Sequence, residues 1–569
     1  MSAICGLRSL YTSGRFLRLC PRPPQAFPSC THKEFNKFYG TSRSSLRITN
    51  LSTRKVNSVS YLNSLAICSS TKLSFTSRED IELNKTIRSL KTVQEHLELF
   101  DTVKIPLDII NKVTMLYIIA KITARDGKQR KFLERERQKS QCGQSSTYAE
   151  LLKSLSTNIS NCQHQGIANL MWALGKIEEK DHTLLQVCEN EILSRDIKTF
   201  NNAGICQIVS GCANLNLTTS DIFLNLEEVI LSGQLRISTF DNQLLSALLV
   251  SFAKTGNGSG ELYDVFLEEI LSRNFWKMDS RALAEFVWSY AKKEFKADKL
   301  FYRVQDEILR RGTNDFQNTD FIQILWAFGK GKKGSKQFFS FLDEQLVSRG
   351  VERFHNVQLL EIVWSFAKSK VTRAEVFDLV KQEVFNRTVH KFQIHELVLI
   401  LWSFVSAQRH DEKLVAEIEG KLYLTDAKTF DSGDLCQIAW SLGRAGKSDS
   451  KLFYVIQAEI FQRGVSEFTT KQKCMLMRGF IEAKRGRKEF YELLVDSFSV
   501  NDLCNLHGSQ ICECLWCLSK TGVEADDLFD ALEREILTKG KSYFRKKQVV
   551  FIMTIFKKLG KSNRKVFEL

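Results

Sequence analysis

The chain has 569 residues, of which 43% are hydrophobic and 26% are charged, a composition that excludes wholesale disorder and a fibrous protein. Its longest apolar runs, such as residues 397–405, fall well short of the roughly 20 residues that a membrane-spanning helix needs, so we expect no membrane span. All five prolines lie within the first 106 residues, which leaves the remaining chain free to form helices almost throughout.

The net charge of +16 is concentrated at the N-terminus. Residues 1–78 contain 12 Lys or Arg and a single acid, Glu34, so the rest of the chain carries an excess of only five positive charges. A leader rich in Arg and Ser with almost no acid is typical of mitochondrial transit segments, and a basic tail that binds nucleic acid is the alternative. We therefore predict a targeting leader over residues 1–78 and a location in the mitochondrial matrix, with the plastid as the alternative.

A repeat of 38 residues dominates the rest of the sequence. The phrase LMWALGKI at 170–177 returns as FVWSYAKK, ILWAFGKG, IVWSFAKS and IAWSLGRA. With the Trp of this phrase as position zero, the units are centred on Trp172, Ser210, Val250, Trp288, Trp326, Trp364, Trp402, Trp440, Arg478, Trp516 and Thr554. Nine of the ten steps are 38 residues long and one is 40. Phe stands ten residues before position zero in eight units: Phe200, Phe240, Phe316, Phe354, Phe392, Phe430, Phe468 and Phe544.

Each unit has the pattern of two helices. Apolar residues at −5, −2, −1, +2 and +3 have helical spacing and predict helix A, for which Asp279, Asn318, Asn356 and Asp431 are candidate N-caps. A second apolar stretch, such as residues 300–312, predicts helix B, in which Glu and Arg stand four residues apart, as in the pairs Glu269 with Arg273, Glu307 with Arg311, Glu383 with Arg387 and Glu459 with Arg463. Since two helices cannot bury their apolar faces alone, the sequence predicts an all-α fold, an α-solenoid superhelix of about 11 two-helix repeats over residues 148–569.

Two segments precede the array. Residues 79–124 have helical periodicity and end in YIIAKITA, which indicates a degenerate N-terminal helical repeat. Residues 125–147 are highly charged, and we expect them to form a linker, either as a loop or as a frayed helix.

The repeat resembles a known group of proteins. Helix pairs of 38 residues that carry W-[AS]-[FL]-[AG]-K, in a chain with an organellar leader, are similar to octotricopeptide repeat proteins and to the related heptatricopeptide repeat proteins. This resemblance covers residues 79–569 and implies organellar RNA binding in transcript processing, stability, translation or ribosome assembly. Many such proteins end in a RAP domain, whereas here we expect repeats up to residue 569, and the proline-rich opening of the octotricopeptide consensus is also missing.

A polar stripe on helix A is the candidate RNA site. Position +4 is a cation in eight units, predicted to contact phosphates: Lys176, Lys254, Lys292, Lys330, Lys368, Arg444, Lys520 and Lys558. Position −3 holds amides or carboxylates, predicted to read base edges: Asn169, Gln207, Glu285, Gln323, Glu361, Gln437 and Glu513. Position +1 is small, which would let a single strand approach.

The same stripe is also compatible with a purely structural role or with a protein partner. A cation in the last turn of a helix complements the helix dipole, a small residue at +1 permits close helix packing, and the stripe could also be a protein-binding groove. Acids at −3 repel phosphate, which argues for base-edge contact or for no RNA at that position. The sequence therefore predicts single-stranded organellar RNA as the partner, with ribosomal RNA or ribosomal proteins as further candidates, and leaves a protein-interaction scaffold as the alternative.

The remaining chemical groups indicate no catalysis. Cys512, Cys514 and Cys517 imitate a metal-binding spacing near His507, but they lie within one helix A, where we expect them to fill the core. Most cysteines stand singly, as expected in a reducing compartment. We find no phosphate loop, catalytic triad or paired-carboxylate motif. We therefore expect no enzyme activity, no metal, no cofactor and no small-molecule substrate.

The leader makes a direct prediction. Deleting residues 1–78 should abolish import into the organelle without unfolding the array, because this segment contains no repeat position and almost no acid. Import assays with isolated mitochondria would measure this, and normal import of the truncated chain would contradict the assignment.

Overall fold

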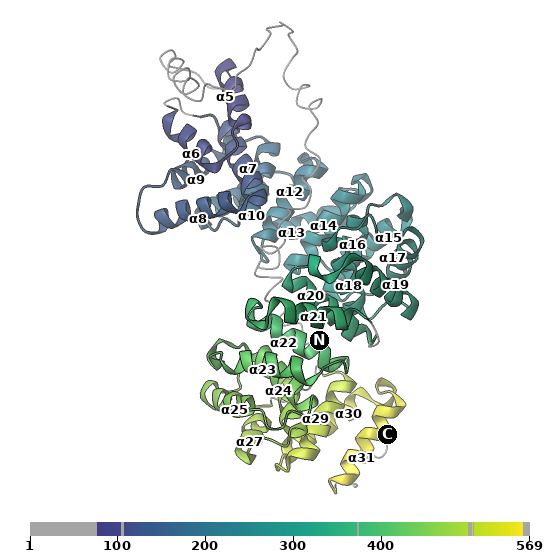
Figure 1. Cartoon of the computed structure of the whole chain (residues 1–569). Helices are drawn as coiled ribbons and strands as arrows, with labels where there is room; N and C mark the ends of the chain where they lie inside the picture. The colour runs from purple at the N-terminus through teal and green to yellow at the C-terminus, as the bar shows by residue number, and fades with distance from the viewer. Residues whose placement is uncertain (1–76, 104–106, 372–374, 499–502, 504–505, 561–569) are drawn as a thin grey trace. The chain divides into compact units, whose positions relative to one another are not determined.

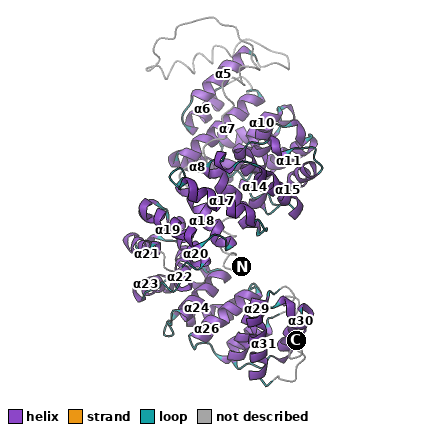
Figure 2. Cartoon of the chain, turned by 90° about the vertical axis from the view of Figure 1, so that its right-hand side faces the viewer, coloured by secondary structure: helices purple, strands orange, loops and turns teal. Residues whose placement is uncertain are grey.

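The structure is a computed structural model that describes residues 77–103, 107–371, 375–498, 503 and 506–560. This part of the chain is 77% helical, with 26 α-helices and no strand (Figure 2), so the predicted all-α fold is confirmed. None of these helices is long and apolar enough to cross a bilayer. The predicted leader, residues 1–78, lies outside the described residues apart from Ser77 and Arg78.

The described chain divides into two compact units. The first, here called the N-unit, runs up to Arg310 and includes Asn314–Gln323, and the second, the C-unit, comprises Arg311–Thr313 and the residues from Ile324 onward. Within each unit, helices that follow one another in the sequence also lie side by side (Figure 1). Each unit is therefore a solenoid of stacked helix pairs.

The helices have the following bounds. The helices preceding the regular repeats are α5 (Arg78–Ser89), α6 (Val93–Thr102), α7 (Ile109–Arg125), α8 (Gly127–Gln141) and α9 (Thr147–Ser156). The A helices are α10 (His164–Ile177), α12 (Asn202–Asn214), α14 (Asn242–Thr255), α16 (Ser280–Lys293), α18 (Asn318–Gly331), α20 (Asn356–Ser369), α22 (Ile394–Ser406), α24 (Ser432–Arg444), α26 (Thr470–Glu482), α29 (Gly508–Thr521) and α31 (Lys546–Lys558). The B helices are α11 (His182–Ser194), α13 (Asp221–Leu231), α15 (Gly260–Ser272), α17 (Asp298–Arg311), α19 (Lys336–Arg349), α21 (Val376–Arg387), α23 (Glu412–Tyr423), α25 (Leu452–Arg463), α27 (Lys488–Asp496) and α30 (Asp526–Lys539).

The segments before the array are more regular than the sequence indicates. Residues 79–124 contain three helices, α5 to α7, and residues 125–147, expected to be a linker, contain the 15-residue helix α8. Leu133 of α8 is buried, and Arg137 Nε lies 3.0 Å from a carboxylate oxygen of Glu179, beyond the end of α10. Burial of one apolar side chain and a long-range ion pair thus anchor a helix whose composition is otherwise that of a solvated segment.

The residue at position −10, which is Phe in eight units, begins each helical pair. In eight units a single 3-10 turn, such as Val351–Arg353, precedes the residue at −10, and Phe354 and its equivalents are buried. Burial of a Phe side chain contributes roughly 1.5–3 kcal/mol, so this position fixes where each helix A starts. Asp279 and Asp431 are N-caps as predicted, whereas Asn318 and Asn356 are the first residues of their helices.

The Glu and Arg pairs of helix B have a second role. Arg387 Nε donates to Glu383 at 2.6 Å as predicted, but its other nitrogens donate to Asn356 Oδ1 at 2.9 Å and to the Glu352 carbonyl at 3.1 Å. Arg273 and Arg463 make equivalent contacts, and Glu307 pairs with Arg310. The arginine therefore ties the end of helix B to the turn that opens its own repeat.

Small residues let consecutive A helices touch along their backbones. A Cβ atom added to Gly211 of α12 would overlap the Met171 carbonyl of α10, and one added to Gly479 of α26 would overlap the Ala439 carbonyl of α24. Gly211 and Gly479 both stand at position +1. Position +1 is therefore small because the preceding A helix lies against it.

This contact predicts opposite outcomes for two glycines of the C-unit. Gly479→Ala should lower the free energy of unfolding by about 1–3 kcal/mol, because the added methyl group overlaps the backbone of α24. Gly420→Ala in helix α23 should instead stabilise the protein by about 0.5–1 kcal/mol, because a Cβ atom at Gly420 meets nothing within 4 Å and alanine favours the helix.

Thermal unfolding followed by circular dichroism would measure both changes. Equal melting temperatures for the two variants would contradict the backbone contact between α24 and α26.

Candidate nucleic-acid interface

The eight predicted phosphate-binding cations all lie in or next to the last turn of an A helix. Five are half-buried and three are exposed: Lys176, Lys254, Lys292, Lys330 and Lys368 in the first group, Arg444, Lys520 and Lys558 in the second. Their surroundings differ between the two units, so each unit is described by itself.

In the N-unit, two of these lysines belong to a group of mutually repelling cations. Burial lowers the pKa of Lys176 to about 8, and Lys254, Arg281 and Arg130 lower it further. Burial also lowers the pKa of Lys254 to about 8, with Glu285 opposing this shift and Arg281 adding to it. An anion binds most favourably next to half-buried ammonium groups that have too little negative charge around them.

In the C-unit, Lys368 lies between two aromatic rings. Its Nζ atom is 4.3 Å from the centroid of the Trp402 ring, in the next repeat, and 5.4 Å from that of Trp364. Burial, followed by repulsion from Lys471, Lys332 and Lys330, lowers the pKa of Lys368 to about 7. The cation is therefore partly engaged in contacts that stack one repeat on the next.

The exposed cation Arg444 already has an acidic partner. Its Nη1 atom lies 3.3 Å from Glu482, which also pairs with Arg478 at 3.0 Å. The charge available to a phosphate at this repeat is correspondingly lower.

The predicted base-reading residues are more enclosed than their polarity suggests. Asn169, Gln323 and Glu513 are half-buried, whereas Gln207, Glu285, Glu361 and Gln437 are buried. In the N-unit, Gln165 donates to both Asn169 and Gln207, and Gln207 donates to Asn169, at 3.0–3.2 Å. These amides tie α10 to α12.

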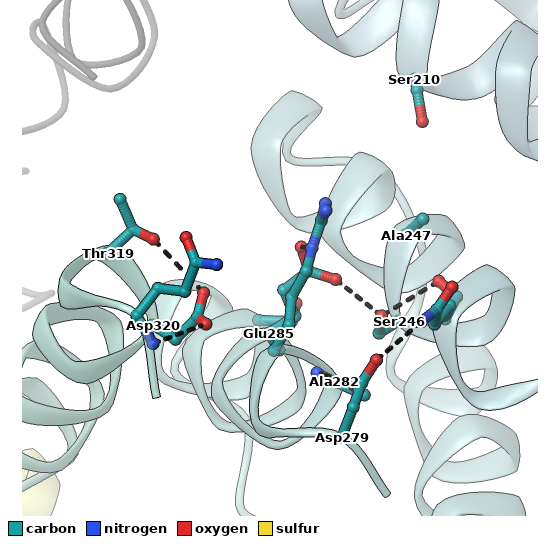
Figure 3. A network of polar contacts seen from close by, with 12 residues as sticks. Ser210, Ser246, Ala247, Asp279, Ala282, Glu285, Thr319 and Asp320 are labelled. Carbon is teal, nitrogen blue, oxygen red and sulfur yellow. Dashed lines mark hydrogen bonds and ion pairs between the residues drawn. The ribbon is translucent and has the colours of Figure 1, made fainter. Parts of the chain in front are cut away.

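Glu285 is the centre of a similar network on α16. Figure 3 shows its carboxylate facing Ser246 of α14 on one side, with Thr319 and Asp320 of α18 on the other. Ser246 Oγ donates to Glu285 at 2.6 Å, and Arg281 Nε donates at 2.8 Å. Burial, opposed by a backbone hydrogen bond and reinforced by repulsion from Glu285, raises the pKa of Asp320 to about 6.

In the C-unit the same row is only partly satisfied. Glu513 of α29 accepts from Arg478 of α26 at 2.8 Å. Gln437 of α24 is 2% exposed, and its Oε1 atom has no hydrogen-bond partner among the described residues.

The small and aromatic positions of helix A serve packing. The serines at +1 in α14, α16, α20 and α22 are buried and donate to the carbonyl four residues earlier. The rings of Trp326 and Trp364 stack with centroids 6.1 Å apart, and Trp364 is 1% exposed. The tryptophans at position zero therefore pack within and between repeats, and the small +1 residues accommodate a helix.

Two cations of this surface are not among those predicted from the repeat. Lys121 of α7 stands four residues after Tyr117, whose ring lies 4.9 Å from Trp172 in the next A helix, α10. The phrase YIIAK at 117–121 shares its Ala and Lys with the W-[AS]-[FL]-[AG]-K pattern and has Tyr in place of Trp, so only a degenerate form of this signal was present in the sequence. Arg281, which contacts Glu285 and repels the lysines, stands at −7, where Lys471 and Lys547 also stand in their own units.

Two other groups of possible metal ligands have partners of their own. Cys514 and Cys517 are buried and Cys512 is half-buried, as expected for cysteines that fill the core. Ligand atoms of His395, Asp431 and Asp434 lie within 4.8 Å of one another, the one such group among the described residues. Asp431 caps α24, and Asp434 contacts His395 Nδ1 at 2.9 Å, so contacts within the protein account for both acids.

No protein-family model matches this chain, and no curated protein shows significant similarity to it.

Proposed function

We propose that this protein is a mitochondrial RNA-binding repeat protein that acts in transcript processing, stability, translation or ribosome assembly and has no catalysis of its own. The observation that carries the proposal is the row of cations at +4, repeated on one face of successive A helices. The acid-poor leader and the resemblance of the repeat to octotricopeptide and heptatricopeptide proteins support it.

The half-buried lysines suit the backbone of a single strand. Lys176 and Lys254 have too little nearby negative charge, so a phosphate placed among them, Lys292 and Arg281 would restore full protonation. An extended strand can follow such a row because phosphate contacts need no defined base sequence.

Base recognition at −3 has to compete with existing hydrogen bonds. A base that bonds to Gln207 or Glu285 must replace contacts from Gln165 or Ser246. Asn169 and Glu513 also accept hydrogen bonds from side chains, but they and Gln323 are partly accessible. We therefore propose that base recognition rests on the half-buried members of the row, Asn169, Gln323 and Glu513.

A protein scaffold, such as a component that binds ribosomal proteins, is the second candidate. Large apolar side chains are exposed on the B helices, among them Tyr302, Tyr454 and Phe461, at 47–64% of their full accessible area. A groove of about 350 Å³ lies between Val389 and helix α23, beside the 79% exposed Leu424. Exposed apolar surface beside a groove is a feature of protein-binding sites.

Crosslinking of RNA to the full-length protein in cells, followed by sequencing, separates the two functions. Sharply bounded transcript segments support RNA recognition by the array. Diffuse ribosomal signal together with a stable protein complex supports the scaffold.

Removing the N-unit cations should weaken RNA binding without unfolding the protein. The triple change of Lys176, Lys254 and Lys292 to Gln should lower affinity for a single-stranded RNA and reduce the slope of log affinity against log salt by about 2, since each lost phosphate contact removes about 0.7. Fluorescence anisotropy over a salt series would measure both quantities.

The matched control changes Lys153, Lys180 and Lys299 to Gln, which removes the same charge from exposed positions outside the A helices. Equal loss of affinity and slope in both triple variants would show that net charge, and not the A-helix row, binds the RNA.

The lowered pKa values predict an unusual pH dependence. Because Lys176 and Lys254 have pKa values of about 8, RNA affinity should fall as pH rises from 7 to 9, whereas lysines with the ordinary value of 10.5 stay charged over this range. Binding should accordingly take up protons near pH 8. Affinity measured across this range should become nearly independent of pH when both lysines are changed to Gln, and a flat profile for the unaltered protein would contradict phosphate contact by these two side chains.

A further inference from the structure

Two cysteines from neighbouring repeats meet inside the C-unit. The Sγ atoms of Cys474 in α26 and Cys514 in α29 are 3.0 Å apart, which is about 1 Å longer than a disulfide bond. Both side chains are buried, with 3% and 1% exposed. A small shift of either side chain would therefore bring the sulfurs to bonding distance.

The repeat register explains why this pair is singular. Cys474 stands at −4 in its unit, and Cys514 stands at −2 in the next. Three other units carry Cys at −4, but the units that follow them carry Leu248, Leu476 and Ile552 at −2. The equivalent contact elsewhere in the array therefore joins sulfur to an aliphatic side chain.

The surrounding groups hold the two thiols in place. Cys517, one turn after Cys514, directs its Sγ toward the Cys474 carbonyl at 3.5 Å. On the same two helices, Arg478 donates to Glu513 at 2.8 Å. The pair thus lies in an interface fixed by an ion pair and by buried packing.

We propose that Cys474 and Cys514 are an oxidisable pair, and that a peroxide converts them to a disulfide that joins two consecutive repeats covalently. In the first step one thiol loses its proton and the thiolate attacks a peroxide oxygen, so that the O–O bond breaks and a sulfenic acid forms. With hydrogen peroxide the leaving hydroxide takes up that proton and becomes one water. In the second step the other thiol attacks that sulfenic sulfur, the S–S bond forms and a second water leaves. Two electrons pass from the sulfurs to the peroxide.

Burial controls how fast this reaction proceeds. Contact with Cys514 and burial raise the pKa of Cys474, so its thiolate is scarce while α26 and α29 stay packed. Oxidation accordingly requires transient opening of this interface and favours small oxidants. The disulfide then restricts the same opening, because each repeat of a solenoid is held mainly by its neighbours.

Peptide mapping of the full-length protein tests the proposal. Reduced protein is treated with hydrogen peroxide at increasing concentrations, unfolded in guanidinium with N-ethylmaleimide, digested and analysed by mass spectrometry. We expect a peptide pair linked through Cys474 and Cys514 while Cys436, at the same repeat position as Cys474 in the preceding unit, remains alkylated. Full alkylation of both cysteines, or overoxidation of either one without a linked peptide, would overturn the proposal.

Thermal unfolding gives a second, independent readout. The oxidised protein should melt a few degrees above the reduced protein, and Cys474→Ala and Cys514→Ala should each abolish this difference. Cys436→Ala is the matched control and should retain it. A difference that persists in Cys474→Ala would assign the effect to other thiols, and the peptide map of the unaltered protein decides the question if a variant fails to fold.

Discussion

Backbone contact between consecutive A helices is the constraint on which the rest of this structure depends. Where Gly211 meets Met171 and Gly479 meets Ala439, there is no room for even a methyl group. In α14, α16, α20 and α22 the same position is a serine that bonds back to its own helix, so its hydroxyl needs no partner across the interface. Because the A helices lie this close, all the remaining repeated positions of one helix lie beside the repeated positions of the next.

That register explains how one row of side chains can be both structural and a candidate for recognition. Because the A helices touch, residues at −3 and −7 of adjacent repeats come within hydrogen-bond distance, as Gln165 and Gln207 do. The tryptophans stack for the same reason, and Lys368 reaches the ring of the next repeat. When an RNA strand binds such a surface, its bases replace hydrogen bonds that the side chains make with one another. The specificity of binding therefore depends on which repeats have polar side chains without a full set of hydrogen bonds.

The chemistry of the surface changes where the sequence departs from the repeat pattern. Arg478 replaces the tryptophan of its unit, yet it lies over the Trp516 ring at 4.9 Å and pairs with Glu482 and Glu513. These ion pairs neutralise positive charge to which an anion would otherwise bind. In the same interface the side chain of Cys474 contacts that of Cys514. This junction therefore differs chemically from its neighbours while it preserves their packing.

The sequence by itself determined the all-α class, the 38-residue register and the positions of the cations, because a repeated pattern of 3.6 periodicity can be satisfied only by stacked helices. It did not predict that helix α8 is anchored, since this depends on the burial of Leu133 and on the ion pair of Arg137 with Glu179, far along the chain. Only the tertiary structure decided which polar residues are enclosed. Whether Glu285 is open to solvent or bonded to Ser246 depends on the distance between two helices, and a single sequence does not contain that distance.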